Sequence, residues 1–219
     1  MCNGCLVNND ISYNMIENNE ILIVKLNNSY YNIMGRDGSL RSREDFCKIE
    51  EFKDGIARVT DKDCFVNFLR IDGSLVSNER FLEAFDFEEG LAIVKRKNEL
   101  YNVLSKDGVL ISFEDFFQIF DFVDGIAKIQ RQDCTWNFLT KYGQILSFEN
   151  FLRATEFSYG ISIVKRLSGS YNIMNMFGSI LLEEDFDYIS VYENAATLLA
   201  VRDKKEFIID SNGKIYLKN

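Results

Sequence analysis

Apolar and polar positions alternate along this chain in short runs, and the same arrangement returns every 35 residues. In one copy, Leu91–Lys95 places a small and a branched residue on one face, and Tyr101–Leu104 follows after a short loop. Runs of this kind are typical of strands. A third strand is predicted over Val109–Ser112, after the turn at Lys106–Gly108.

A fourth segment in each copy fits neither the helical nor the strand period. It is exemplified by Phe113–Phe120, which we interpret as either a strand or a short helical turn. By contrast, the strand after the loop is apolar at two adjacent positions in every copy. Because adjacent strand residues point to opposite faces, this strand is predicted to be central and covered on both sides. The pairs are Ile33-Met34, Phe68-Leu69, Val103-Leu104, Phe138-Leu139, Ile173-Met174 and Ile208-Ile209.

Two series of glycines keep the 35-residue interval. Glycine tolerates positive φ, so both series are predicted to occupy turns. The first series is Gly38, Gly73, Gly108, Gly143, Gly178 and Gly213. The second is Gly55, Gly90, Gly125 and Gly160, and it lapses at Ala195.

Phenylalanine and asparagine also recur at this interval. The asparagines are Asn32, Asn67, Asn102, Asn137 and Asn172, with Phe207 at the equivalent place in the last copy. A buried amide needs hydrogen-bond partners, and a repeated one can bond the backbone of its own turn or of the next repeat. We therefore interpret this series as architectural rather than catalytic.

The repeated motif also points to a family. In one copy its main positions are Phe87, Gly90, Ala92, Val94, Asp107 and Gly108. This pattern, in about six copies over nearly the whole chain, resembles the WG (also called KWG) β-repeat of bacterial proteins. The Trp-Gly pair that names the family is absent, and Trp136-Asn137 is the nearest equivalent. The resemblance implies a non-catalytic binding or scaffolding module.

We therefore predict an all-β protein of tandem 35-residue β-meander repeats in an open superhelical, solenoid-like array. A six-bladed β-propeller is the alternative. The expected organisation is one repeat domain, 1–219, with a degenerate first segment and an atypical last unit. The expected units are 1–42, 43–77, 78–112, 113–147, 148–182 and 183–219.

Composition narrows the expected chemistry. The 219 residues include no histidine and no proline, and the formal net charge is −9. The absence of histidine excludes imidazole acid–base catalysis and histidine-liganded metals. The acidic balance argues against nucleic-acid binding. No apolar run is long enough to span a bilayer and no signal peptide is evident, so we expect a cytoplasmic or virion-associated protein.

Few residues suggest reactive chemistry. Cys2 and Cys5 have the spacing of a redox pair or half a zinc site, but no second pair accompanies them. Carboxylates cluster at Glu44-Asp45, Glu114-Asp115 and Glu183–Asp185, at one phase of the repeat, and are interpreted as a solvated edge. We expect no enzyme activity, no cofactor and no metal.

Candidate binding residues lie near the ends of the predicted strands. They are Trp136, Tyr101, Tyr171, Lys95, Arg96, Lys165 and Arg166. Aromatic side chains with a polar group favour interfaces and sugar-binding surfaces, and the cations could attract an acidic partner. Packing between repeats and ordinary solvated charge are the competing interpretations.

A second rhythm, of two repeats, overlies the first. At one position of the repeat, apolar and cationic residues alternate from copy to copy. They are Ile23, Arg58, Ile93, Lys128 and Ile163, and Leu198 ends the alternation. Either a two-repeat ancestor was duplicated, or odd and even repeats have different surroundings. The function that we predict is a scaffold that binds another protein. The alternatives are a carbohydrate-binding module and a structural component of a phage or bacterial assembly.

Overall fold

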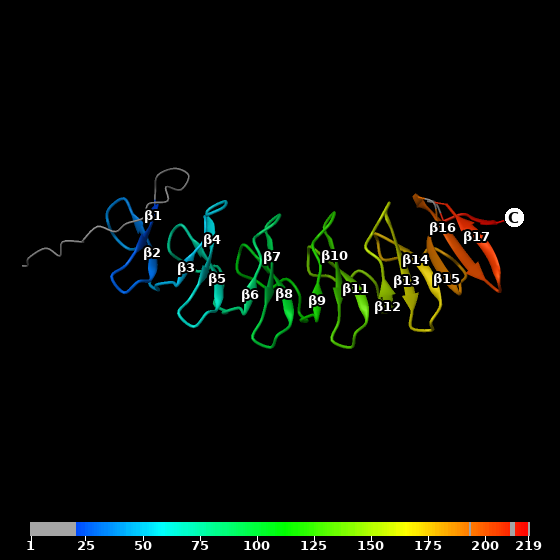
Figure 1. The fold of residues 1–219 in the computed structure, drawn as a ribbon, viewed down its shortest axis with the longest axis horizontal. Coiled ribbons are helices and arrows are strands. Elements are labelled where there is room, and N and C mark those ends of the chain that lie inside the picture. The colour runs from blue at the N-terminus through cyan, green and yellow to red at the C-terminus, as the bar shows by residue number, and fades with distance from the viewer. Residues whose placement is uncertain (1–20, 193, 211–212, 219) are drawn as a thin grey trace, which may run out of the picture. The chain divides into compact units, whose positions relative to one another are not determined.

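The computed structural model describes residues 21–192, 194–210 and 213–218. These residues form antiparallel strands joined by turns, which confirms an all-β fold of tandem meander repeats of about 35 residues (Figure 1). The chain divides into two compact units, Met1–Leu110 and Ile111–Asn219, described separately below as unit 1 and unit 2. No helix long and apolar enough to cross a bilayer occurs in the described ranges.

Unit 1 contains three sheets, each made of strands consecutive in sequence. The first is β1 (Ile21–Lys25) and β2 (Tyr31–Gly35). The second is β3 (Lys48–Ile49), β4 (Ile56–Thr60) and β5 (Val66–Arg70). The third is β6 (Glu83–Ala84), β7 (Leu91–Lys95) and β8 (Tyr101–Ser105).

Unit 2 contains two sheets. The six-stranded sheet is β9 (Gln118–Ile119), β10 (Ile126–Gln130), β11 (Trp136–Thr140), β12 (Phe151–Ala154), β13 (Ile161–Arg166) and β14 (Tyr171–Asn175). The C-terminal sheet is β15 (Tyr188–Tyr192), β16 (Asn194–Arg202), β17 (Lys205–Ile209) and β18 (Ile215–Leu217). Among the described residues, no sheet combines strands from the two ends of the chain.

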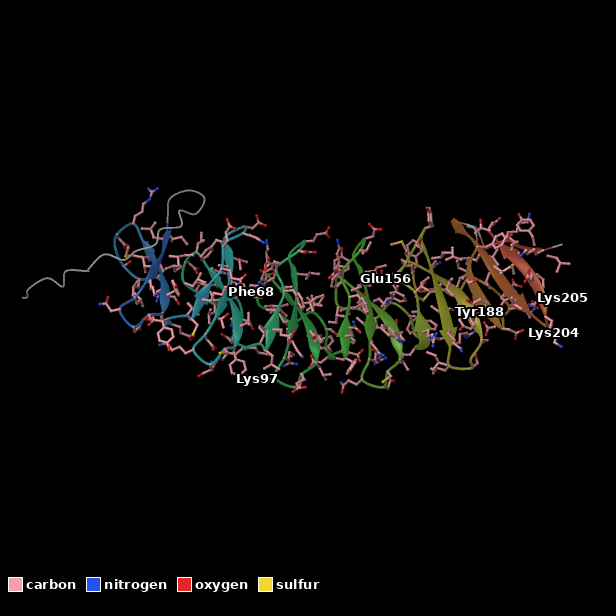
Figure 2. The ribbon with its side chains drawn as sticks, in the orientation of Figure 1. Phe68, Lys97, Glu156, Tyr188, Lys204 and Lys205 are labelled. Carbon is pink, nitrogen blue, oxygen red and sulfur yellow. The ribbon has the colours of Figure 1, made fainter. Side chains whose placement is uncertain are left out.

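Successive sheets within a unit pack face to face. One face of the β4–β5 pair contributes Ala57 and Leu69 to a core shared with Ile33 of the preceding sheet. The opposite face contributes Phe68 to a core shared with Val94 of the following sheet. Because Phe68 and Leu69 are both buried, the strand is covered on both faces, as predicted. The prediction that it is central in its sheet is wrong, because β5 is the last strand of its sheet, as β8 is of the next. Figure 2 labels Phe68 within this stack.

Both glycine series occupy turns with positive φ, as predicted. Asp54 and Gly55 have φ of 49° and 77° in a two-residue hairpin, the geometry of a type I′ turn. In the other series, Gly108 has φ of 87° and donates its N–H to the carbonyl of Ser105. A Cβ at Gly108 would also collide with the carbonyl oxygen of Val76 in the preceding repeat. Glycine is therefore required there for two reasons.

The predicted third strand, Val109–Ser112, is wrong. Only one bridge, between Leu104 and Leu110, follows this turn, and the equivalent places in the other inner repeats also have a single bridge. The cause is visible at Asn67, whose side-chain oxygen accepts the backbone N–H of Ser77, 3.4 Å away, and whose amide donates to the Ser77 carbonyl, 2.9 Å away. The asparagine thus takes the place of a backbone partner and ends the ladder.

The last repeat supports this explanation. Phe207 stands where the other copies have asparagine and cannot make these hydrogen bonds. The chain there continues as β18, which pairs in register with β17 from Phe207–Leu217 to Ile209–Ile215. The segment Phe113–Phe120, which the sequence left open, contains only the two-residue strand β9.

The last repeat also differs in register. Ala57 pairs with Leu69 twelve positions later, whereas Leu198 pairs with Ile209 eleven positions later. A two-residue turn at Asp203–Lys204, both with positive φ, replaces the longer loop of the other copies. Leu198 is consequently on the buried face, which explains why the alternation ends at this residue.

Candidate functional site

The predicted lysines and tyrosines meet as cross-strand neighbours. In unit 1, Lys95 of β7 lies directly opposite Tyr101 of β8, with its Nζ 5.5 Å from the ring centroid. Glu83 of β6 lies opposite Lys95 on the other side, and its carboxylate accepts a hydrogen bond from the Lys95 ammonium at 3.4 Å. Tyr101, followed by Glu83, raises the pKa of Lys95, against an opposing effect of burial. Lys95 is therefore held by its own sheet.

The same arrangement recurs in unit 2. Lys165 lies opposite Tyr171, 5.1 Å from the ring centroid. Trp136 takes the equivalent place in β11, where Lys128 Nζ lies 5.3 Å from its ring and the Phe120 ring lies 6.0 Å away. The ring of Trp136 is half-buried within the sheet.

The predicted arginines are engaged with carboxylates at the start of their own repeats. Arg96 donates from Nε and Nη2 to both carboxylate oxygens of Glu79, at 3.0 and 3.1 Å. Arg166 binds Glu149 in the same way, at 3.0 and 2.8 Å, and its third nitrogen reaches Asp185. Burial opposes the charge on Arg166, but the hydrogen bonds to Asp185 and Glu149 raise its pKa.

These contacts also place the carboxylates that the sequence suggested were a solvated edge. Glu114 pairs with Arg131 at 2.7 Å, and Glu184 pairs with Arg202. Asp45 and its counterpart Asp185 accept hydrogen bonds from the architectural asparagines. Asp45 and Asp185 therefore join one repeat to the next, whereas Glu114 and Glu184 pair within their own repeats. No group of three or more cysteine or carboxylate side chains with metal-binding geometry occurs among the described residues.

The two-repeat rhythm falls at the junction between sheets. Arg58 donates to the carbonyl of Ala84 in the next sheet, 2.8 Å away, and pairs with Glu50 at 2.7 Å. At the equivalent position Lys128 reaches Glu156 at 3.4 Å, whereas Ile163 packs against an apolar core. This repeat position therefore joins neighbouring sheets through a paired cation in some repeats and through an aliphatic side chain in others.

A hollow of about 210 Å³ opens beside Arg58 in unit 1. Its apolar floor includes Phe68 and Phe87, whose ring centroids are 4.6 Å apart. At its rim Lys53 donates to Asp86 at 2.8 Å. This hydrogen bond lowers the pKa of Asp86, against the raising effect of burial. Charges at this rim are thus paired with one another.

A different set of residues, which sequence reasoning missed, is exposed on unit 2. Phe113 and Phe148 are fully exposed, and Phe177 and Tyr142 are 87% and 77% exposed. A Cβ at Gly143, next to Tyr142, would collide with the carbonyl of Ile111, so these two segments are in close contact. The same relation joins Gly178 to Leu146. We call Phe113, Tyr142, Phe148 and Phe177 the aromatic strip.

Comparison between repeats would have shown that these positions are exposed. The position of Phe113 and Phe148 is polar in other copies, and that of Tyr142 and Phe177 is aspartate in other copies. The polar equivalents are Arg43, Asn78 and Glu183 for the first position, and Asp37, Asp72 and Asp107 for the second. An aromatic residue at a position that is polar elsewhere is expected to face solvent.

Cys64 and Cys134 are exposed free thiols at one loop position, where both have positive φ. Ser29, Glu99 and Gly169 occupy the same conformation in the other copies. These cysteines are equivalent residues of the repeat, 70 residues apart. Cys2 and Cys5 lie outside the described residues.

No family model matches the chain, and no curated protein matches it. Among solved structures, BamB from Moraxella catarrhalis is 11% identical, over 95% of this chain and 76% of that one, with a TM-score of 0.34. The computationally designed Ika8 protein is 16% identical, over 89% and 70%, with a TM-score of 0.36. The WD40 β-propeller domain of Doa1 is 12% identical, over 94% and 76%, with a TM-score of 0.30. TM-scores this low assign no fold family to the chain.

Proposed function

We propose that this chain is a non-catalytic β-repeat scaffold that binds another protein through the aromatic strip of unit 2. The observation that carries the proposal is the complete exposure of Phe113 and Phe148. An aromatic side chain offers about 150–250 Å² for burial, so the four residues together offer roughly 600 Å² or more. Aromatic residues are enriched at protein–protein interfaces relative to the rest of the protein surface.

The surroundings of the strip favour an apolar partner surface. Glu114 and Glu149 each follow a strip phenylalanine in sequence, and their charges are paired with Arg131 and Arg166. Lys141 lies over the ring of Tyr142, 5.6 Å from its centroid. The resemblance to WG repeats also supports a binding or scaffolding role.

The proposed contact differs from the residues first suggested by the sequence. Trp136, Tyr101 and Tyr171 are half-buried and lie beside lysines of their own sheets, so they offer less free ring surface than the strip. This weighs against a carbohydrate site at those rings. The lack of histidine and the pairing of charges around the hollow support a role without catalysis.

Site-specific photo-crosslinking tests the proposal. A photoreactive phenylalanine analogue at Phe148 should give a discrete product with one partner protein in an extract of the source cells. The same analogue at Leu167, which is 61% exposed on a loop of the same unit, serves as the matched control. Products that are identical at the two positions, or the absence of any product at Phe148, would refute the proposed surface.

A variant with serine at all four strip positions provides the second arm. Because the strip side chains are exposed, we expect the thermal midpoint to stay close to that of the parent protein. Added in excess, the unlabelled parent should suppress the crosslink at Phe148, whereas this variant should not. Equal suppression by the two proteins would show that the strip is not the contact.

A further inference from the structure

The C-terminal sheet has an inner face and an outer face. Its inner face contributes Ile189, Leu198 and Ile209 to a core shared with Ile161 and Ile173 of the preceding sheet. Because strand residues alternate in direction, the residues between these positions point the opposite way. In Figure 1 this sheet, in orange and red, follows β13 and β14 of the same unit.

The outer face carries an apolar row across three strands. Leu199 of β16 lies opposite Ile208 of β17, and Ile208 lies opposite Tyr216 of β18. Val201 is on the same face of β16, next to this row. Tyr216 is 46% exposed, and none of these four residues belongs to the core cluster that the inner face of this sheet forms with the preceding one.

Comparison with the other repeats shows that this face is unusual. Ile208 stands at the repeat position of Ile33, Phe68, Val103, Phe138 and Ile173, which are all buried to 2% exposure or less. Within each unit another sheet covers this position, at Ile33 and Phe68 in unit 1 and at Ile173 in unit 2. Ile208 is only half-buried. Outer faces of terminal repeats are normally polar, because they remain in water.

We propose that the outer face of the C-terminal sheet is a self-association surface, on which two copies of this chain stack through Leu199, Ile208 and Tyr216. The reason to choose a second copy is the continuity with the packing inside each unit, where the same row is always covered by another sheet of this chain. Symmetric dimers bury one patch against itself, which an uncharged apolar row permits.

Electrostatics are compatible with this stacking. Glu206 and Lys218 lie beside the row and pair with each other at 2.8 Å, so two like faces meet without a net charge from this pair. The inferred surface does not include the aromatic strip and is independent of the proposed function.

The mass of this 219-residue chain in solution tests this inference. Light scattering after size exclusion should give twice the monomer mass of 25.4 kDa at tens of micromolar protein. Ile208→Arg should give the monomer mass, because it places a charge in the centre of the buried row. Tyr216→Glu provides a second variant at a more exposed position, in case Ile208→Arg does not fold. Circular dichroism reports on folding in both.

The matched control is the serine variant of the strip, which should remain a dimer because its substitutions lie outside the C-terminal sheet. A parent protein that stays monomeric up to several hundred micromolar would overturn the inference. So would a dimer that persists in folded Tyr216→Glu and Ile208→Arg proteins. A dimer abolished only by the strip substitutions would instead assign self-association to the strip.

Discussion

The side chain of Asn137 satisfies both backbone groups of Ser147. Its oxygen accepts the Ser147 N–H at 3.2 Å, and its amide nitrogen donates to the Ser147 carbonyl at 3.0 Å. The same amide nitrogen donates to the carbonyl of Glu149 at 2.9 Å. In each repeat that has it, this asparagine side chain takes the place of a neighbouring strand's backbone groups. The strand ladder ends there, and the chain continues toward the next repeat.

Replacing this asparagine should be costly. Asn137→Leu leaves the backbone groups of Ser147 without partners in a buried site, where each unmet group costs about 1–3 kcal/mol. We expect a loss of about 2–4 kcal/mol in the free energy of unfolding, measured by urea titration. Asn78→Leu is the control, because Asn78 is exposed. Equal effects of the two substitutions would refute the role of Asn137.

Close approach between repeats can be separated from backbone conformation at two glycines. Gly108 and Gly90 have φ of 87° and 85°, but only a Cβ at Gly108 meets another backbone segment. Both Gly108→Ala and Gly90→Ala should pay about 1–2 kcal/mol for the left-handed conformation. Gly108→Ala should lose roughly a further 1–3 kcal/mol through overpacking. Thermal melts that shift equally would contradict the contact with Val76.

The loop position shared by Glu99 and Gly169 offers a stabilising change. Glu99 has φ of 66° and is exposed, and Gly169 shows that glycine fits the same turn. Glu99→Gly should raise stability by about 0.5–1 kcal/mol, because relief of the left-handed strain exceeds the added entropy of the unfolded chain. Lys97→Gly, in the same loop without positive φ, should lower stability. A lower melting temperature for Glu99→Gly would contradict this account.

Asp185 should make stability depend on pH in the acid range. Burial alone would raise its pKa, but hydrogen bonds from Asn172, Ser170 and Arg166 hold the pKa below its ordinary value. The ionised form is thus favoured in the folded state. Its stabilisation is complete above the unfolded pKa of about 3.9 and is lost as the pH falls through the lower folded pKa.

We therefore expect Asp185→Asn to flatten the decline in stability between about pH 5 and pH 2.5. The variant should fold, because Asn150 occupies the equivalent position and accepts from Asn137 at 2.8 Å and from Arg131 at 3.1 Å. Urea midpoints measured across this range test the expectation. Parallel curves for the parent and the variant would show that Asp185 ionises equally in both states.

The repeat, the strand that is buried on both faces and the turns could be predicted from the sequence. Periodic glycines and adjacent apolar pairs report directly on backbone conformation and burial in each repeat. The error at Val109–Ser112 arose because a short apolar run after an Asp-Gly turn resembles a returning strand. A side chain several residues earlier, not the segment itself, decides whether the ladder continues.

The aromatic strip and the C-terminal sheet were harder to predict. Phe113 and the buried Phe116 lie close together in one segment, and composition does not distinguish them. The change of register at Leu198 is also hidden in the sequence. One residue fewer separates Leu198 from Ile209, and one residue more precedes Leu198, so the 35-residue spacing is unchanged. Contacts between neighbouring repeats, rather than local pattern, determine both features.

The hydrogen bonds of each asparagine reach at most 13 residues along the chain, as from Asn137 to Asn150. Such contacts close only short loops, which favours rapid formation. During synthesis, each copy can be fastened once the first few residues of its successor have left the ribosome. The length of the protein can therefore change by whole copies in evolution without a new folding pathway.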